Sequence, residues 1–159
     1  MMQSYAENKP KSAKERMGCN METLRWKTRI ALLWVIAAVG MSAHMDLIAV
    51  DPAAMKVAAE WAATARPVAW VFMSLFWLVP LWMAFVAMTA RGSSNRRANF
   101  IVGIVFTILN IWHFFMCGVP IFQRGLAEPT AHHILLVGST VGATALIAWY
   151  AWKWPRQEE

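Results

Sequence analysis

The sequence predicts an all-α integral membrane protein, a four-helix bundle in a single domain. Hydrophobic residues make up 58% of the 159-residue chain. The mean hydropathy of +0.41 is too high for a soluble domain and indicates that much of the surface of the protein faces lipid. Four apolar runs each approach the ~20 residues that a helix needs to cross the hydrocarbon of a bilayer. These runs are residues 30–50, 67–90, 98–122 and 131–152.

Polar segments at the two ends complete the predicted organisation. Residues 1–28 contain Ser, Asn, Glu and Lys without apolar periodicity, which predicts a solvated cytoplasmic arm rather than another folded unit. Residues 29–155 are the predicted transmembrane domain, and residues 156–159 are a polar tail. All of the predicted folded structure is therefore in the membrane region.

The distribution of basic residues predicts the orientation of the bundle. Lys and Arg accumulate in the short cytoplasmic loops of membrane proteins. In an even-span topology, all 15 of these residues except Lys56, Arg66 and Arg124 fall on the side that holds both termini. We therefore expect both termini in the cytoplasm, in a bacterial inner membrane. Topology and anionic lipid account for the net charge of +6, so nucleic-acid binding is not needed to explain it.

The connections between the spans carry their own signals. Asp51-Pro52 offers an N-cap followed by proline at the first helical position, so residues 53–65 are predicted to form a short helix at the outer membrane interface. Pro80, near the middle of the second span, removes a backbone hydrogen bond and predicts a kink. The polar stretch 91–97 predicts a short cytoplasmic turn between antiparallel spans.

Small residues in the fourth span predict close helix packing. Gly138 and Gly142 lie one turn apart, in a pattern that lets another helix approach the backbone closely. We expect this contact within the bundle or between subunits of a homo-oligomer.

All four histidines fall toward the outer end of the predicted spans. One lies late in the first span, one at a similar depth in the third, and two open the fourth, so that side chains from three helices can converge. Met41 and Met45 share a helix face with His44, and Met116 and Cys117 share one with His113. Imidazole with soft sulfur suits copper or zinc better than magnesium, and haem is a further alternative. The candidate ligands are His44, His113, His132, His133, Met41, Met45, Met116 and Cys117.

Asp46 and Asn110 allow a different interpretation of the same region. Ionisable residues inside an apolar run usually face the bundle interior, so both are candidate buried polar residues. Asp46 can pair with His113 or Asn110 through a hydrogen bond, without a metal. His44 and Asp46 point to different sides of a helix, which argues against a site that contains both. In a third alternative no cluster forms and the methionines are apolar filler.

Three stretches resemble a known family. They are Leu33-Trp34-Val35 running to Asp46 and on to Asp51-Pro52, then Asn95-Arg96-Arg97-Ala98-Asn99 leading into Gly103, and the ending Trp149-Tyr150-Ala151-Trp152-Lys153-Trp154-Pro155. Across roughly residues 29–155, the chain resembles a family of small bacterial four-span membrane proteins without an established activity, distantly similar to the DoxX-type membrane proteins. The resemblance implies a four-helix bundle and a role for Asp46, which looks like the acidic residue late in that family's first span. It carries nothing over to the histidines.

Three functional hypotheses follow. The chain has no Walker loop, dinucleotide glycine fingerprint, Cys-x-x-Cys, His-Glu-x-x-His or nucleophile elbow. The first hypothesis is therefore a non-catalytic accessory or structural subunit, or a self-associating bundle, whose partners are the lipid bilayer and other membrane subunits or further copies. The second is a small redox or metal-handling protein that uses the outer histidines. The third is a binder of a lipophilic ligand such as lipid or quinone, using Pro80, Trp77, Phe114 and Phe115.

Overall fold

The computed structural model describes residues 13–124 and 131–155, without the side chains of residues 13–16, 19, 53, 57, 117–124 and 131–133. Within these ranges the chain is helical and contains no strand. The helices are α1 (Ala13–Val50), α2 (Pro52–Thr64), α3 (Pro67–Thr89), α4 (Gly92–Arg124) and α5 (Ala131–Lys153).

Four of the described helices are long and apolar enough to cross a membrane. The described chain is therefore all-helical, as predicted, and its four long apolar helices are compatible with a multi-pass membrane bundle. The 13 residues of α2 are too few to cross the hydrocarbon of a bilayer. The stretches that qualify are Asn20–Val50, Pro67–Thr89, Gly92–Met116 and Ile134–Lys153.

Two helices begin earlier than the sequence predicted. α1 starts at Ala13, so most of the predicted arm is helical and continuous with the first span; residues 13–28 contain no proline and many good helix formers. α4 starts at Gly92, so residues 92–97 of the polar stretch form the first turns of a helix instead of a loop. Gly92 has a φ of 64°, a left-handed conformation that glycine adopts easily, and the chain reverses there.

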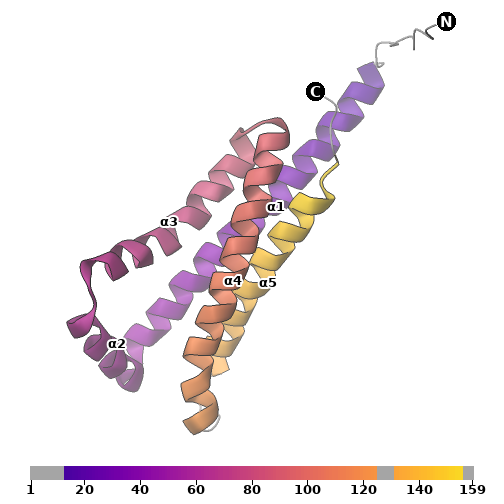
Figure 1. Ribbon diagram of the computed structural model, residues 1–159. Coiled ribbons are helices and arrows are strands. Elements are labelled where there is room, and N and C mark those ends of the chain that lie inside the picture. The colour runs from indigo at the N-terminus through magenta and orange to yellow at the C-terminus, as the bar shows by residue number, and fades with distance from the viewer. Residues whose placement is uncertain (1–12, 125–130, 156–159) are drawn as a thin grey trace, which may run out of the picture.

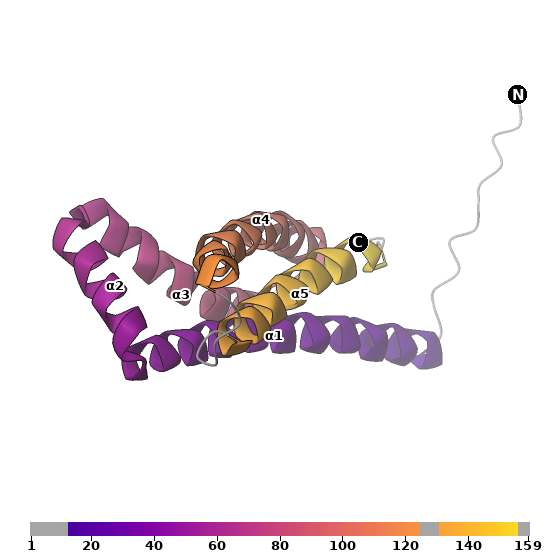
Figure 2. The same ribbon diagram turned by 90° about the horizontal axis from the view of Figure 1, so that it is seen from below.

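The N-terminal end of α1, the C-terminal end of α5 and the turn between α3 and α4 lie at the same end of the bundle (Figure 1). We call it the terminal end, and the opposite end the distal end. α5 packs against both α1 and α4, whereas α3 packs mainly against α1. α2 and the first half of α3 lie to one side of the other helices (Figure 2). The closely packed unit is therefore α1, α4, α5 and the second half of α3.

The sequence of α3 explains why only its second half joins the bundle. α3 changes direction near its middle (Figure 1), where Pro80 lacks the amide hydrogen that an unbroken helix requires. Near the N-terminal end of α3, Trp70 packs against Trp61 of α2, with ring centroids 5.4 Å apart. The buried residues of α3 are Pro80, Met83, Ala84 and Ala87.

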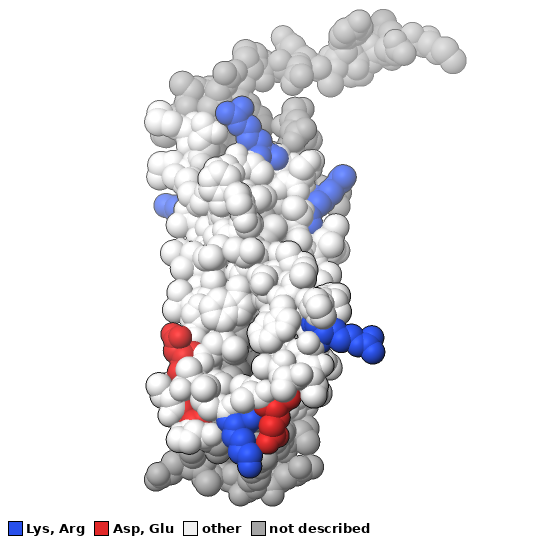
Figure 3. All heavy atoms as spheres, turned by 90° about the vertical axis from the view of Figure 1, so that its left-hand side faces the viewer, with Lys and Arg blue, Asp and Glu red and all other residues white. Residues whose placement is uncertain are grey.

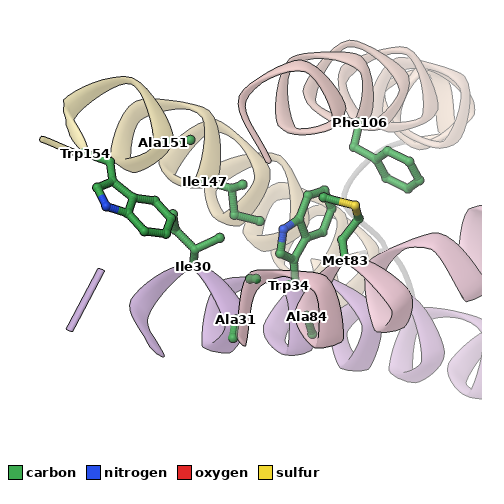
Figure 4. Close-up of a cluster of buried hydrophobic side chains, with 10 residues drawn as sticks. Ile30, Ala31, Trp34, Met83, Ala84, Phe106, Ile147, Ala151 and Trp154 are labelled. Carbon is green, nitrogen blue, oxygen red and sulfur yellow. The ribbon is translucent and has the colours of Figure 1, made fainter. Parts of the chain in front are cut away.

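An apolar core fills the bundle between its middle and the terminal end. All four long helices contribute to it, and the side chains point toward one another (Figure 4). Trp34 lies at its centre and is fully buried. The members are Ile30, Ala31, Trp34, Met83, Ala84, Ala87, Phe106, Ile147, Ala151 and Trp154.

Outside this core, the distribution of side chains is the reverse of that in a soluble protein. Phe72, Trp82, Phe85 and Trp112 are each more than half exposed on the bundle surface, as lipid-facing residues would be. On the face in Figure 3, charged side chains lie toward the two ends, and the acidic ones lie only in the distal half. The buried polar side chains are His44, Asn95, Asn99, Asn110, Thr140 and Thr144.

Two glycines bring the backbones of neighbouring helices close together. A Cβ atom on Gly40 of α1 would lie 2.9 Å from Cγ2 of Thr140 in α5. A Cβ atom on Gly103 of α4 would lie 3.1 Å from the backbone nitrogen of Ala148 in α5. Both distances are too short for an ordinary contact, so α5 can pack this closely only against glycine at these positions.

The glycine pair predicted from the sequence behaves differently. Gly142 is exposed and has nothing within 4 Å of the position of its missing Cβ atom. Gly138 has only an ordinary contact, 3.8 Å to Cε2 of Phe114. Gly142 therefore makes no close helix contact within the chain, and the predicted contact between subunits stays a prediction.

Candidate functional site

His44 of α1 and His113 of α4 face each other inside the distal half of the bundle. Their Nε2 atoms are 3.3 Å apart. The ring centroids are 5.3 Å apart and the ring planes are nearly perpendicular, at 89°. His44 is fully buried and His113 is half-buried. The structure thus brings together two of the four predicted histidine ligands, from helices that are far apart in the sequence.

The separation of 3.3 Å fits two chemical arrangements. Two neutral imidazoles can share an N–H···N hydrogen bond, in which one ring donates and the other accepts. Alternatively, two nitrogen ligands about 2.0–2.1 Å from one metal lie about 3.3–3.4 Å apart at a tetrahedral angle and about 3.5–3.6 Å apart at a trigonal angle. Axial histidines on opposite sides of a haem iron would lie about 4 Å apart, with the macrocycle between them. The pair therefore fits a small metal ion better than haem.

Aromatic rings connect the histidine pair with the apolar core. The ring of Phe76 from α3 lies 6.2 Å from that of His113 and stacks on Phe106 at 5.4 Å. Phe106 in turn meets the indole of Trp34 edge-on, with centroids 5.7 Å apart. The three helices α1, α3 and α4 thus hold the His113 ring against a continuous row of rings, which limits the rotamers that it can adopt.

The predicted methionine ligands divide by burial. Met41, one helical turn before His44 and on the same face of α1, is only 6% exposed. Met45 is half-buried, and Met116 is 59% exposed on the outside of α4. Met41 therefore has the most suitable position for a soft ligand beside the pair.

Three other predicted ligands fall outside the described side chains. Cys117 belongs to α4, one turn after His113, and His132 and His133 belong to the first turn of α5. Among the side chains that the structure describes, no group of three or more His, Cys, Asp or Glu residues is arranged to hold a metal ion. The described part of the candidate site is thus the histidine pair with Met41.

Helix register places the backbone of the first turn of α5 at the depth of His44. Gly40 approaches Leu136, Ser139 and Thr140 of α5, and the two helices are antiparallel. His44 lies one turn farther along α1, so it is level with the part of α5 about one turn earlier, around residues 132–136. The backbones of α1, α4 and α5 therefore lie at the same level around His44, as the predicted convergence of three helices requires.

Asn110 and Asp46 have opposite environments. Asn110 is 2% exposed, and its Oδ1 atom lies 3.3 Å from the hydroxyl of Thr140, which donates a shorter bond of 2.7 Å to the Val137 carbonyl. Asp46 is exposed on the outer side of α1, two residues beyond the buried His44. The prediction that Asp46 is buried is wrong, because the helical rotation that turns His44 inward turns Asp46 outward.

The third hypothesis, a lipophilic pocket, depends on aromatic residues that are arranged differently. Trp77 and Phe114 are half-buried, whereas Phe115 is 60% exposed. Phe114 and Phe115 meet edge-on with centroids 6.0 Å apart. Phe115 faces outward, so these three residues cannot all line one interior pocket.

Sequence reasoning missed a second buried polar cluster, near the terminal end. Asn99 of α4 accepts a 2.8 Å hydrogen bond from Nε1 of Trp34, and its own Nδ2 atom donates to Oδ1 of Asn95 at 2.6 Å. Asn95 and Asn99 are one turn apart and both fully buried. We call Trp34, Asn95 and Asn99 the asparagine cluster. Two asparagines at i, i+4 in an apolar helix are the signal that could have revealed it.

Asn95 of the asparagine cluster also donates hydrogen bonds to carbonyl oxygens at the C-terminal end of α3. The Nδ2 atom of Asn95 donates to the carbonyl oxygens of Ala87 and Ala90, at 3.0 and 2.9 Å. The Nζ atom of Lys27 in α1 donates to the Ala90 carbonyl at 2.7 Å and lies 3.4 Å from that of Met88. The last carbonyls of a helix have no partner within it, so these side chains replace the missing bonds. The cluster therefore has a structural role, because it completes the hydrogen bonding at the end of α3.

Comparison with known proteins gives no relative for this arrangement. No protein-family model matches the chain. No curated protein and no solved structure matches it either. The case for a function therefore depends on the geometry of the chain itself.

Proposed function

We propose that this protein is a metal-handling membrane protein that holds a copper(I) ion between α1 and α4, with His44 and His113 as ligands. The observation that carries the proposal is the 3.3 Å separation of the two Nε2 atoms, which equals the spacing of two nitrogens on one small metal ion. A neutral imidazole is a common metal ligand.

Copper(I) is preferred because of what surrounds the pair. The buried Met41 offers a soft thioether one turn from His44, and thioether ligands select copper(I). Structural zinc normally takes four ligands from Cys, His and carboxylates. The described side chains supply two such ligands at this point, so they suit copper(I) better than zinc.

The proposal also includes the orientation of the bundle in the membrane. Basic side chains at the terminal end include Lys27, Arg91 and Arg97, whereas the distal side carries Lys56 and Arg66 together with acidic residues. By the positive-inside rule, the terminal end faces the cytoplasm. The copper ion would then lie in the outer half of a bacterial inner membrane, with α2 at the outer interface.

Copper(I) titration of the full-length protein in mild detergent tests the proposal. A colorimetric copper(I) chelator serves as competitor, under reducing and oxygen-free conditions. We expect about one copper(I) per chain, and at least about tenfold weaker binding for His44→Ala and for His113→Ala, because each removes one of two nitrogen ligands. Met41→Leu should weaken binding more than Met116→Leu, the matched exposed control.

Several results would overturn the proposal. One is less than a tenth of an equivalent of bound copper(I), and another is unchanged affinity in both histidine variants. Tighter binding of Zn²⁺ than of copper(I) would contradict the choice of metal. Thermal unfolding and circular dichroism of each variant distinguish lost binding from lost structure. Folded, metal-free protein would favour the first hypothesis, in which the pair is an interhelical hydrogen bond of a structural subunit.

A further inference from the structure

A second feature, independent of the histidine pair, is a pocket of about 390 Å³ at the terminal end. Three helices meet around it. Thr23 comes from α1, Ser93, Arg96 and Arg97 come from the first turns of α4, and Trp154 directly follows α5. The sequence motif Asn95–Asn99 thus supplies two neighbouring arginines to one concave surface.

The charged residues that line the pocket are Arg96 and Arg97, both from α4. Among the residues that the structure describes, neither the lining nor the first turn of α4 contains an acidic residue. Arg96 is fixed in place, because its Nη1 atom donates a 3.2 Å hydrogen bond to the carbonyl of Trp154. A guanidinium has five N–H groups, so this bond leaves others directed elsewhere. Arg97 is exposed, and the backbone N–H groups at the start of α4 add further positive potential.

The surroundings favour a lipid as the source of the anion. From Arg97, an exposed apolar face of α4 runs away from the pocket along Ile101, Val105 and Ile108, at successive helical turns. Ile101 and Ile108 are 59% and 61% exposed. A headgroup at Arg97 could therefore extend its acyl chains along α4, which a free anion in solution cannot do.

We infer that this pocket binds the phosphate-bearing headgroup of an anionic phospholipid, with Arg96 and Arg97 as the contacting cations. Arg96 is hydrogen-bonded to the carbonyl of Trp154, and Arg97 is exposed, one turn before the exposed Ile101 of α4. Basic pockets between membrane helices recognise anionic headgroups through such charges. The occupied pocket would tie α1, α4 and α5 together at the terminal end.

Native mass spectrometry of the full-length protein, with phosphatidylglycerol or phosphatidylcholine of the same acyl chains, measures this binding. We expect the protein to retain phosphatidylglycerol at least about fivefold better than phosphatidylcholine. Arg97→Gln should lower the retention of phosphatidylglycerol by about fivefold, as expected for one arginine at a membrane surface. Arg91→Gln removes another exposed charge, six residues earlier in the chain and outside the pocket, and should leave retention unchanged.

Measurements on the same variants distinguish a lipid ligand from other anions. Equal retention of the two lipids would overturn the inference, as would equal effects of the two arginine substitutions. Inorganic phosphate provides the remaining comparison, measured as a shift in thermal unfolding. An Arg97-dependent stabilisation by phosphate without any retained phosphatidylglycerol would contradict the lipid assignment and identify a site for a soluble anion.

Discussion

The indole Nε1 of Trp34 donates a 2.8 Å hydrogen bond to Oδ1 of Asn99, which lies 65 residues later in the chain. Both side chains are fully buried. A polar group in the interior of a membrane bundle has no water to bond with, so a mutual bond between two helices is strongly favoured over separation. The bond also fixes the rotation of α1 relative to α4, which is the rotation that turns His44 toward His113.

Removal of this bond should destabilise the bundle. We expect Trp34→Phe and Asn99→Leu each to lower the free energy of unfolding by about 1–3 kcal/mol, because a buried polar partner or packing volume is lost. The double variant should show a coupling energy of about 0.6 kcal/mol, the average for hydrogen bonds between membrane helices. Unfolding of the four proteins in mixed micelles measures it. Trp112→Phe, at an exposed site, is the control, and a coupling energy of zero would show that the bond contributes nothing.

Alanine substitutions of the glycines should separate close helix contacts from open surface. Gly103→Ala should cost about 1–3 kcal/mol, since its methyl group would meet the backbone of Ala148 at 3.1 Å and the helices would have to move apart. Gly142→Ala should be neutral, or stabilising by up to about 1 kcal/mol through helix propensity. Thermal unfolding in detergent compares the two. A large loss for Gly142→Ala would instead indicate a contact with another copy of the chain.

Labelling of single cysteines should establish the orientation of the bundle. In a chain with Cys19→Ser and Cys117→Ser, we would place one cysteine by Ser94→Cys at the terminal end and another by Ala63→Cys on α2, both at exposed positions. A membrane-impermeant maleimide should label the α2 position in intact cells, and the terminal-end position only after permeabilisation. The reverse pattern would show that the termini lie outside.

Asp46 is an exception to the rule used to predict its position. The rule that ionisable residues in membrane helices face inward selected Asp46, but the structure turns His44 inward and exposes the carboxylate. The sequence did indicate that the two cannot share a side of the helix. It could not show which of them faces the interior, because α1 has apolar residues all round and its rotation depends on its neighbours.

The glycines and asparagines illustrate the same limit. A small-residue motif can be read at Gly138 and Gly142, yet the close approaches occur at Gly40 and Gly103, where Thr140 and Ala148 lie opposite. The sequence predicts Asn95 in a polar turn and Asn99 at the start of the third span. The structure joins them in a buried cluster, in contact with Trp34 and the end of α3.

The sequence alone predicted the all-helical chain, the four long apolar helices and the similar level of His44 and His113 along their helices, because these depend on segment length, hydropathy and the rise per residue. Only the tertiary structure decided that the two histidines meet, that Asp46 faces outward and that Arg96 and Arg97 share a pocket. These outcomes depend on the rotation and register of each helix against its neighbours. In a bundle whose helices are apolar on every side, packing shape and a few buried hydrogen bonds set that rotation.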